Sequence, residues 1–385
     1  MTLSGAELYR VVDAYASLGD HRTGDAGDLA TAPWLAGELR ALGATVDVRP
    51  VTFQRYVAEW EVRLDGEVVE SLPLFYEGVG RLRAAPATVM VDPRPTPSGP
   101  TSTIELDGCA ETANTARAAG REVVVFALEH PLGLLAAPNR RPRAARSFPV
   151  IQVAGRHRRQ LGAASTVVDL DARIEPGRSA NVVARFGTGP LSETVVVTTP
   201  ISGWFRCGGE RGTGIAVALA LAEALAAQRP VLVLGATGHE LATFGAELLD
   251  TEVEEAPRGV VHVGANAACA AGPPDGPAVA TTATQGHLAA KLPLRFAGRD
   301  AEGVAVEAAL APSGWRVSRP RPATDPASWA GEASTWAPRG VTLLSVIDAN
   351  PYFHTPQDVP EAVTSPAVLH DVAQALIAAA SAALT

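Results

Sequence analysis

Short apolar runs alternate with helical segments throughout the second half of this chain. Strands are expected at residues 193–199, 230–236 and 258–264, with helices at about 212–228 and 240–250 between them. Runs that are apolar at nearly every position and are separated by helices are typical of a mostly parallel sheet with both faces covered. The sequence therefore predicts an α/β fold with a mostly parallel, mixed central sheet flanked by helices.

Helical patterns also open and close the chain. Ser4 and Glu7 form a capping-box pattern at the start of a helix predicted over residues 5–18, and a second helix is predicted over residues 27–42. The apolar run at 367–384 is interrupted by polar side chains, so we expect a packed helix and no membrane span. The N-terminus lacks the pattern of a secretory signal peptide.

The segment between the second predicted helix and the region of alternating strands and helices has a different sequence pattern. From about residue 58 to residue 177, short strand-like runs are broken by Pro and Gly, which predicts a β-rich insert. Residues 272–325 are rich in Pro, Gly and Ala and weakly patterned, so we expect an irregular excursion near the site.

Charge and cysteine content limit the partners and the compartment. The net charge of −9 and the pI near 5.4 give no electrostatic reason to expect a nucleic-acid or anionic-membrane partner. Cys109, Cys207 and Cys269 are too few and too scattered for a disulfide framework. A reducing compartment, and hence a cytoplasmic location, is the expectation.

Chemically capable residues gather where the predicted strands end. Pro200, Glu210, His239, Glu240 and Gly264 all fall at or just past strand ends. Active sites of open α/β sheets lie beyond the carboxyl ends of the strands, so these positions are expected to form one constellation.

A last motif, Tyr-Phe-His-Thr-Pro-Gln-Asp at 352–358, completes a recognisable series. The order and spacing of the segments resemble the zinc aminopeptidases of the aminopeptidase Y and glutaminyl cyclase type, and this motif resembles that family's Tyr-His-Thr-x-x-Asp. The resemblance implies a discontinuous aminopeptidase-like catalytic domain, residues 1–57 and 178–385. It also implies that residues 58–177 form a protease-associated-like insert domain.

The resemblance also implies how many metal ions the site holds. Pro200 and Ser202 stand where the family has the histidine and the aspartate of a His-x-Asp motif, and Gly264 stands where it has another aspartate. Pro200 and Gly264 are the unshared ligand positions of one zinc site, so that site is expected to be empty. Glu210, Glu240 and His354 match the ligands of the other site. Two carboxylates, a histidine and a water form an open tetrahedral zinc site, so the resemblance implies one zinc ion.

Other residues in these segments have candidate roles beside metal binding. His239 stands where the family has its general base, and imidazole is a competent base near neutral pH. Trp204 and Arg211 lie where substrate would bind, although Trp204 is equally suited to packing the loop. Cys207 is a soft ligand, a nucleophile, or a buried or loop thiol without a chemical role, and the last reading is favoured. His262 is expected to have a packing role.

Three functions follow from these readings. The first is a single-zinc metallohydrolase or acyl-transfer enzyme acting on an amide bond of a small peptide or amino-acid derivative. The alternative is a catalytically inactive binding or scaffold protein with the peptidase fold. A third reading uses Pro200, Trp204, Arg206 and Arg211 to form a metal-free pocket for an anion or carboxylate. A salt bridge between Arg211 and Glu210 at the metal position would argue against zinc.

Overall fold

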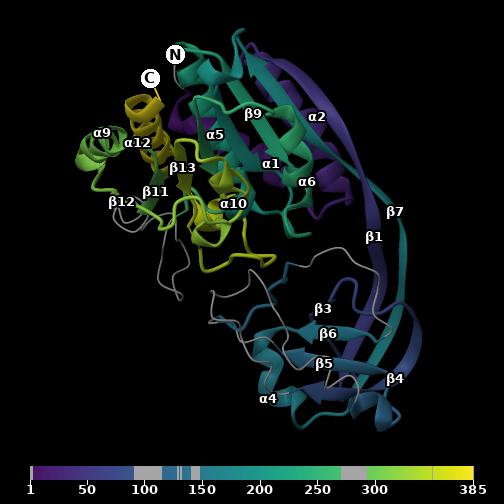
Figure 1. Ribbon diagram of the computed structural model, residues 1–385. Coiled ribbons are helices and arrows are strands. Elements are labelled where there is room, and N and C mark those ends of the chain that lie inside the picture. Colours follow the sequence, from purple (N-terminus) through teal and green to yellow (C-terminus); the bar gives the residue numbers. More distant parts are fainter. Residues whose placement is uncertain are drawn as a thin grey trace.

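The chain folds into two lobes joined by a long two-stranded ribbon, as seen in a computed structural model (Figure 1). The structure describes residues 3–90, 115–127, 130, 132–139, 148–269, 293–348 and 350–384. Cys109 lies outside these residues. The ribbon consists of β1 (Thr45–Leu64) and β7 (Thr166–Phe186), which pair antiparallel along their whole lengths. Both predicted insert boundaries, residues 58 and 177, fall within this ribbon.

The larger lobe is built on a mixed sheet whose strand order is β12-β11-β13-β10-β8-β9-β7. Its central strands run parallel: β8 (Val195–Pro200), β9 (Val231–Ala236), β10 (Gly259–Val263) and β13 (Leu343–Val346). At one edge, β11 (Pro293–Ala297) is antiparallel to β13 and parallel to β12 (Arg316–Ser318), while β7 is antiparallel to β9 at the other. The predicted mostly parallel α/β fold is confirmed.

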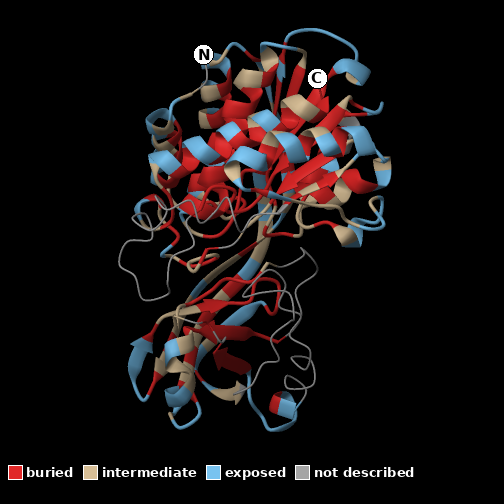
Figure 2. Ribbon diagram, turned by 90° about the vertical axis from the view of Figure 1, so that its left-hand side faces the viewer, coloured by how far each residue is buried: buried red, intermediate tan, exposed pale blue. Residues whose placement is uncertain are grey.

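Helices cover both faces of this sheet, because alternate strand residues point to opposite faces. Val195 and Val197 belong to one buried cluster, which also holds α1 (Gly5–Ser17), α2 (Ala26–Ala41), α5 (Thr213–Ala226), α9 (Asp300–Leu310) and α12 (Pro366–Leu384). Val196 belongs to a second cluster on the other face with α6 (Phe244–Leu248) and α10 (Ala333–Trp336). Figure 2 shows the buried residues concentrated in the sheet and on the inner sides of the helices.

Local sequence signals set the ends of the first two helices. Ser4 Oγ accepts a hydrogen bond from the Glu7 amide, and the Glu7 carboxylate accepts one from the Ser4 amide, so the predicted capping box is present. Gly43, with φ at +95°, directly follows the C-cap residue of α2. Among the described helices, α12 alone is long and apolar enough to cross a bilayer, but more than half of it is buried against α9, α5 and α1.

The smaller lobe is rich in short strands. Its elements are β2 (Glu67–Val69), β3 (Ser71–Pro73), β4 (Gly80–Met90), β5 (Val123–Ala127), β6 (Val150–Val153) and α4 (Arg158–Leu161). β4, β5 and β6 are parallel neighbours, β3 pairs antiparallel with β6, and β4 also pairs with β7 of the ribbon. A β-rich segment was expected here; its relation to protease-associated domains stays a prediction.

One expectation about the larger lobe is wrong. Residues 293–318, which were expected to be irregular, form β11, α9 and β12. The helix forms because Val306 and Leu310 are buried against the main cluster, a tertiary contact that the high Ala and Gly content conceals in the sequence. Residues 270–292 lie outside the described part of the chain.

Candidate functional site

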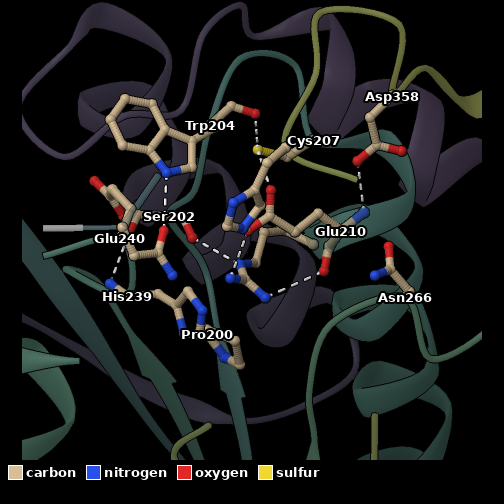
Figure 3. Close-up of polar contacts among 12 residues, drawn as sticks. Pro200, Ser202, Trp204, Cys207, Glu210, His239, Glu240, Asn266 and Asp358 are labelled. Carbon is tan, nitrogen blue, oxygen red and sulfur yellow. Dashed lines mark hydrogen bonds and ion pairs between the residues drawn. The ribbon is translucent and has the colours of Figure 1, made fainter. Parts of the chain in front are cut away.

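The predicted constellation assembles at the carboxyl ends of β8 and β9 (Figure 3). Ser202 and Trp204 lie in the loop after β8, and this loop leads into a π-helical turn, η3 (Gly208–Gly212), before α5 begins. His239 and Glu240 lie in the turn after β9. π-Helical turns are rare and widen the helix locally, and here the turn carries Glu210 and Arg211 side by side.

Glu210 and Arg211 form a buried ion pair. Arg211 Nη2 lies 2.7 Å from Glu210 Oε1, and both side chains are inaccessible to solvent. Arg211 also donates from Nε to the Ser202 carbonyl at 2.7 Å and from Nη1 to the Glu210 carbonyl at 3.2 Å. Burial alone would raise the pKa of Glu210, but His354 and Arg211 outweigh it and lower that pKa to about 2.

His354, from the closing motif, contacts the same carboxylate. Its Nε2 lies 3.1 Å from Glu210 Oε1, and its Nδ1 lies 2.8 Å from the Ala137 carbonyl in the smaller lobe. The ring is completely buried, and Nε2 makes no well-formed hydrogen bond within the described chain. A separation of 3.1 Å is close to the roughly 3.3 Å expected between two ligands of one tetrahedral zinc ion. This pair is the feature that would suit a metal.

Glu240, the third predicted ligand, is committed elsewhere. Its Oε2 accepts a hydrogen bond from Ser202 Oγ at 2.9 Å, and its Oε1 accepts one from the Thr23 amide at 2.5 Å. Burial raises the pKa of Glu240, although these hydrogen bonds oppose the shift. Both oxygens therefore already have protein partners.

These contacts decide whether the residues fit a zinc ion. Arg211 supplies a positive charge to the very oxygen of Glu210 that would bind the metal, and Glu240 is bonded to Ser202 and Thr23. Within the described residues, no three or more His, Cys, Asp or Glu side chains converge as a metal-binding group. As arranged, the three predicted ligands do not fit zinc.

Neither of the two positions at which the resemblance implies missing ligands offers a donor side chain. Pro200 is buried and offers no donor atom. A Cβ atom placed on Gly264 would lie 2.4 Å from Ile347 Cγ1 and 2.8 Å from His262 Cε1, so an aspartate could not stand there without displacing Ile347. At Gly264, the side chains of Ile347 and His262 occupy the space that a metal-binding side chain would need.

His239 has a partner that the sequence does not reveal. Its Nδ1 lies 2.6 Å from Glu332 Oε1, and Glu332 Oε2 lies 3.4 Å from Nε2 of His262. Nδ1 of His262 lies 2.9 Å from Ser345 Oγ. His262 is buried, as expected. Glu332 was missed because it lies 93 residues beyond His239 in a segment without a recognisable motif.

The residues considered for substrate binding pack inside the protein. Trp204 is 2% exposed, donates from Nε1 to Asn139 Oδ1 at 2.8 Å, and stacks on Phe75 with ring centroids 5.3 Å apart. Both partners belong to the smaller lobe. Cys207 is buried, and burial raises its pKa well above the usual value, so it is not a reactive thiol.

For the third reading, an anion pocket, one of the two arginines is already paired with a carboxylate. Arg206 donates from Nε to the Ala16 carbonyl, and Arg211 is engaged with Glu210 and Ser202. Arg211 is therefore not available to an anion, whereas Arg206 is exposed and is bonded only through Nε in these contacts.

Asp358 holds the π-helical turn in place. Its two oxygens accept hydrogen bonds from the amides of Gly209 at 2.9 Å and Glu210 at 2.8 Å, and Oδ1 also lies 3.2 Å from Asn350 Nδ2. Burial raises the pKa of Asp358 to about 7, although the donated amides oppose the shift. Asp358 thereby connects the closing motif to the turn that carries Glu210.

Comparison with solved structures confirms the resemblance at the level of the fold. A zinc aminopeptidase from Bacillus subtilis superposes with a TM-score of 0.69, at 15% identity over 98% of this chain and 94% of that one. The chain has the fold of the zinc aminopeptidases. An aminopeptidase from Aneurinibacillus sp. strain AM-1 gives a TM-score of 0.66 at 14% identity, covering 98% and 93% of the two chains. A peptidase M28 precursor from Shewanella amazonensis gives 0.70 at 17%, covering 97% and 92%. No protein-family model matches the sequence, and no curated protein matches it significantly.

Proposed function

We propose that this protein is a metal-independent binding protein built on the aminopeptidase fold, and that its ligand is a small peptide or amino-acid derivative. One observation carries the proposal: the Arg211 guanidinium is buried against Glu210, where a catalytic metal would need that carboxylate. A fixed internal cation neutralises the carboxylate permanently, so the site needs no ion to be stable. The ligand class is supported by the aminopeptidases that share the fold.

The arrangement of the carboxylates argues against a hydrolytic water held by zinc. Zinc binding would require Arg211 to leave Glu210 and Glu240 to leave Ser202, which would strand a buried guanidinium and a buried hydroxyl. Buried polar groups without partners cost about 1–3 kcal/mol each, and more for charged groups.

A second candidate is an amide hydrolase or acyl-transfer enzyme, with or without one zinc ion. It is supported by the contact between His239 and Glu332, since a carboxylate that orients a histidine is a common feature of general bases. It is also supported by the aminopeptidase fold. In this candidate His239 moves the proton.

Metal content and hydrolysis of the full-length protein separate the two candidates. We expect less than one zinc per ten chains by mass spectrometry after dialysis, and no hydrolysis of a panel of aminoacyl-aminomethylcoumarins with or without added zinc. The same panel of amino-acid amides and dipeptides, tested by calorimetry, is expected to contain at least one ligand.

Two results would overturn the proposal in different ways. One zinc per chain together with chelator-sensitive hydrolysis would establish the second candidate. Absence of both binding and hydrolysis across the panel would show that the ligand class is wrong.

We also propose that the protein works in the cytoplasm. Cys207 and Cys269 are both buried free thiols, which suits a reducing compartment.

A further inference from the structure

His239 is the accessible member of the site. Its side chain is 12% exposed, whereas the side chains of Glu210, Arg211 and His354 are completely buried. A ligand that reaches this end of the sheet from solvent would therefore meet His239 before any of the others.

Behind His239 lies a continuous chain of buried polar groups. Glu332, 1% exposed, contacts His239 Nδ1 with one oxygen and His262 Nε2 with the other. The backbone around it is held by Trp329, Ala333 and Trp336, which all belong to the buried cluster on that face of the sheet. Glu332 is therefore a fixed partner for His239 and not a mobile surface carboxylate.

The hydrogen-bond directions along this chain are determined by chemistry. Burial opposes the charge on Glu332, but His239 and His262 outweigh it and hold the pKa of that carboxyl well below its ordinary value. An ionised carboxylate can only accept, so His239 must donate from Nδ1 and His262 from Nε2. In the neutral form of His262, Nδ1 then accepts from the Ser345 hydroxyl.

We infer that Glu332 is a positioning residue that holds His239 as the tautomer with hydrogen on Nδ1, so that Nε2 presents a lone pair to a hydrogen-bond donor of the ligand. His262 and Ser345 hold the second oxygen of Glu332 and fix the carboxylate in turn. A lone pair on Nε2 can accept from an N–H or O–H group, whereas an anionic group offers it no donor. The inference rests on the proposed function only in treating His239 as the ligand-facing residue.

The tautomer of His239 can be measured without any ligand. In full-length protein with ¹⁵N-labelled histidine, two-bond proton–nitrogen spectra distinguish a protonated from an unprotonated ring nitrogen. The His239 signals are identified by their loss in His239→Asn. We expect His239 to carry hydrogen on Nδ1 in the wild type, and to shift predominantly to the Nε2–H form in Glu332→Ala.

Controls separate positioning from general damage. His21, which is buried between Thr31 and the Tyr15 carbonyl, should keep its signals in every variant. Glu302→Gln alters another buried glutamate, at the start of α9, and should leave His239 unchanged. If Glu332→Ala fails to fold, Glu332→Leu decides, because leucine fills part of the same space but offers Nδ1 no acceptor, so His239 should again shift to the Nε2–H form.

An unchanged His239 tautomer in a folded Glu332 variant, or a wild type that already carries hydrogen on Nε2, would overturn the inference. For any dipeptide that binds the wild type, Glu332→Ala should weaken binding at least tenfold. If no dipeptide binds, the ligand class in the proposed function fails, while the tautomer measurement still decides the role of Glu332.

Discussion

Replacing Arg211 by methionine tests whether the buried ion pair stabilises the fold in place of a metal. Methionine has a similar length but no charge, so the substitution removes three hydrogen bonds, of 2.7, 3.2 and 2.7 Å. The Ser202 carbonyl and the Glu210 carboxylate then lose their buried donor. Breaking one partner out of a buried pair costs about 3–5 kcal/mol, and we expect a loss in that range. Because His354 remains beside Glu210, we expect the loss of stability to lie in the lower half of this range.

The measurement is urea denaturation followed by tryptophan fluorescence, with Trp329 and Trp336 reporting on the larger lobe. The decisive comparison is the double variant Glu210→Gln/Arg211→Met, in which no buried charge is stranded. It should be more stable than Arg211→Met alone, with a coupling energy of about 1–3 kcal/mol. A loss below about 1 kcal/mol for Arg211→Met, or strict additivity in the double variant, would refute the reasoning.

Three further predictions follow from other contacts. In a thermal scan, excess EDTA or zinc should change the unfolding midpoint of the wild type by no more than about 1 °C. A ligand that binds the folded state and is present at 100 times its Kd would instead add about 2.7 kcal/mol to the free energy of unfolding, so a clear rise of the midpoint with zinc would contradict this prediction. Burial raises the pKa of Asp28 from 3.8 to about 7, so the folded state holds a proton that the unfolded state has lost, and this carboxyl destabilises the fold increasingly as pH rises from about 4 to 7. The free energy of unfolding of Asp28→Asn should therefore rise relative to that of the wild type as pH increases from about 4 to 7, by up to about 4 kcal/mol. Urea titrations of the two proteins at each pH measure this difference, and the opposing contribution of His21 cancels because both proteins contain it. A difference that does not change with pH would contradict the prediction. Trp204→Ala removes the stack on Phe75 and should cost about 3–5 kcal/mol in the same denaturation assay, whereas a loss below 1 kcal/mol would mean that the lobes are held together by other contacts.

The fold could be predicted from the sequence because its signals are local. Apolar runs and a capping box report on residues that are close in the chain, and the positions of β8, β9 and β10 followed directly from them. The helix α9 was not predicted, because its few apolar residues indicate a helix only once they are seen to be buried against the main cluster. Its boundaries therefore needed the tertiary structure.

The site could be predicted only as far as the identity of its residues. Matching by type showed that Glu210, Glu240 and His354 are competent ligands, and the structure does bring Glu210 and His354 together. Comparing residue types with those of a metal site does not show which other groups in the protein form hydrogen bonds or ion pairs with the same side chains. Arg211 was recognised as a competitor, but whether it wins depends on distances, and Glu332 had no signal in the sequence at all.

The replaced positions are better explained as one network than as independent losses. Ser202 stands where the resembled family has an aspartate, and it contacts three members of the site at once. Its carbonyl accepts from Arg211 at 2.7 Å, its hydroxyl donates to Glu240 at 2.9 Å, and the same hydroxyl oxygen accepts from the His239 amide at 3.2 Å. An aspartate at this position could not donate to Glu240 and would add a third buried carboxylate beside a single guanidinium. Ser202 and Arg211 therefore depend on each other: the Ser202 carbonyl accepts a hydrogen bond from Arg211, while the Ser202 hydroxyl donates to Glu240, which Arg211 does not contact. Such interdependence is expected of the metal-independent site that we propose, and it predicts that Ser202→Asp alone would destabilise the protein without creating a zinc site.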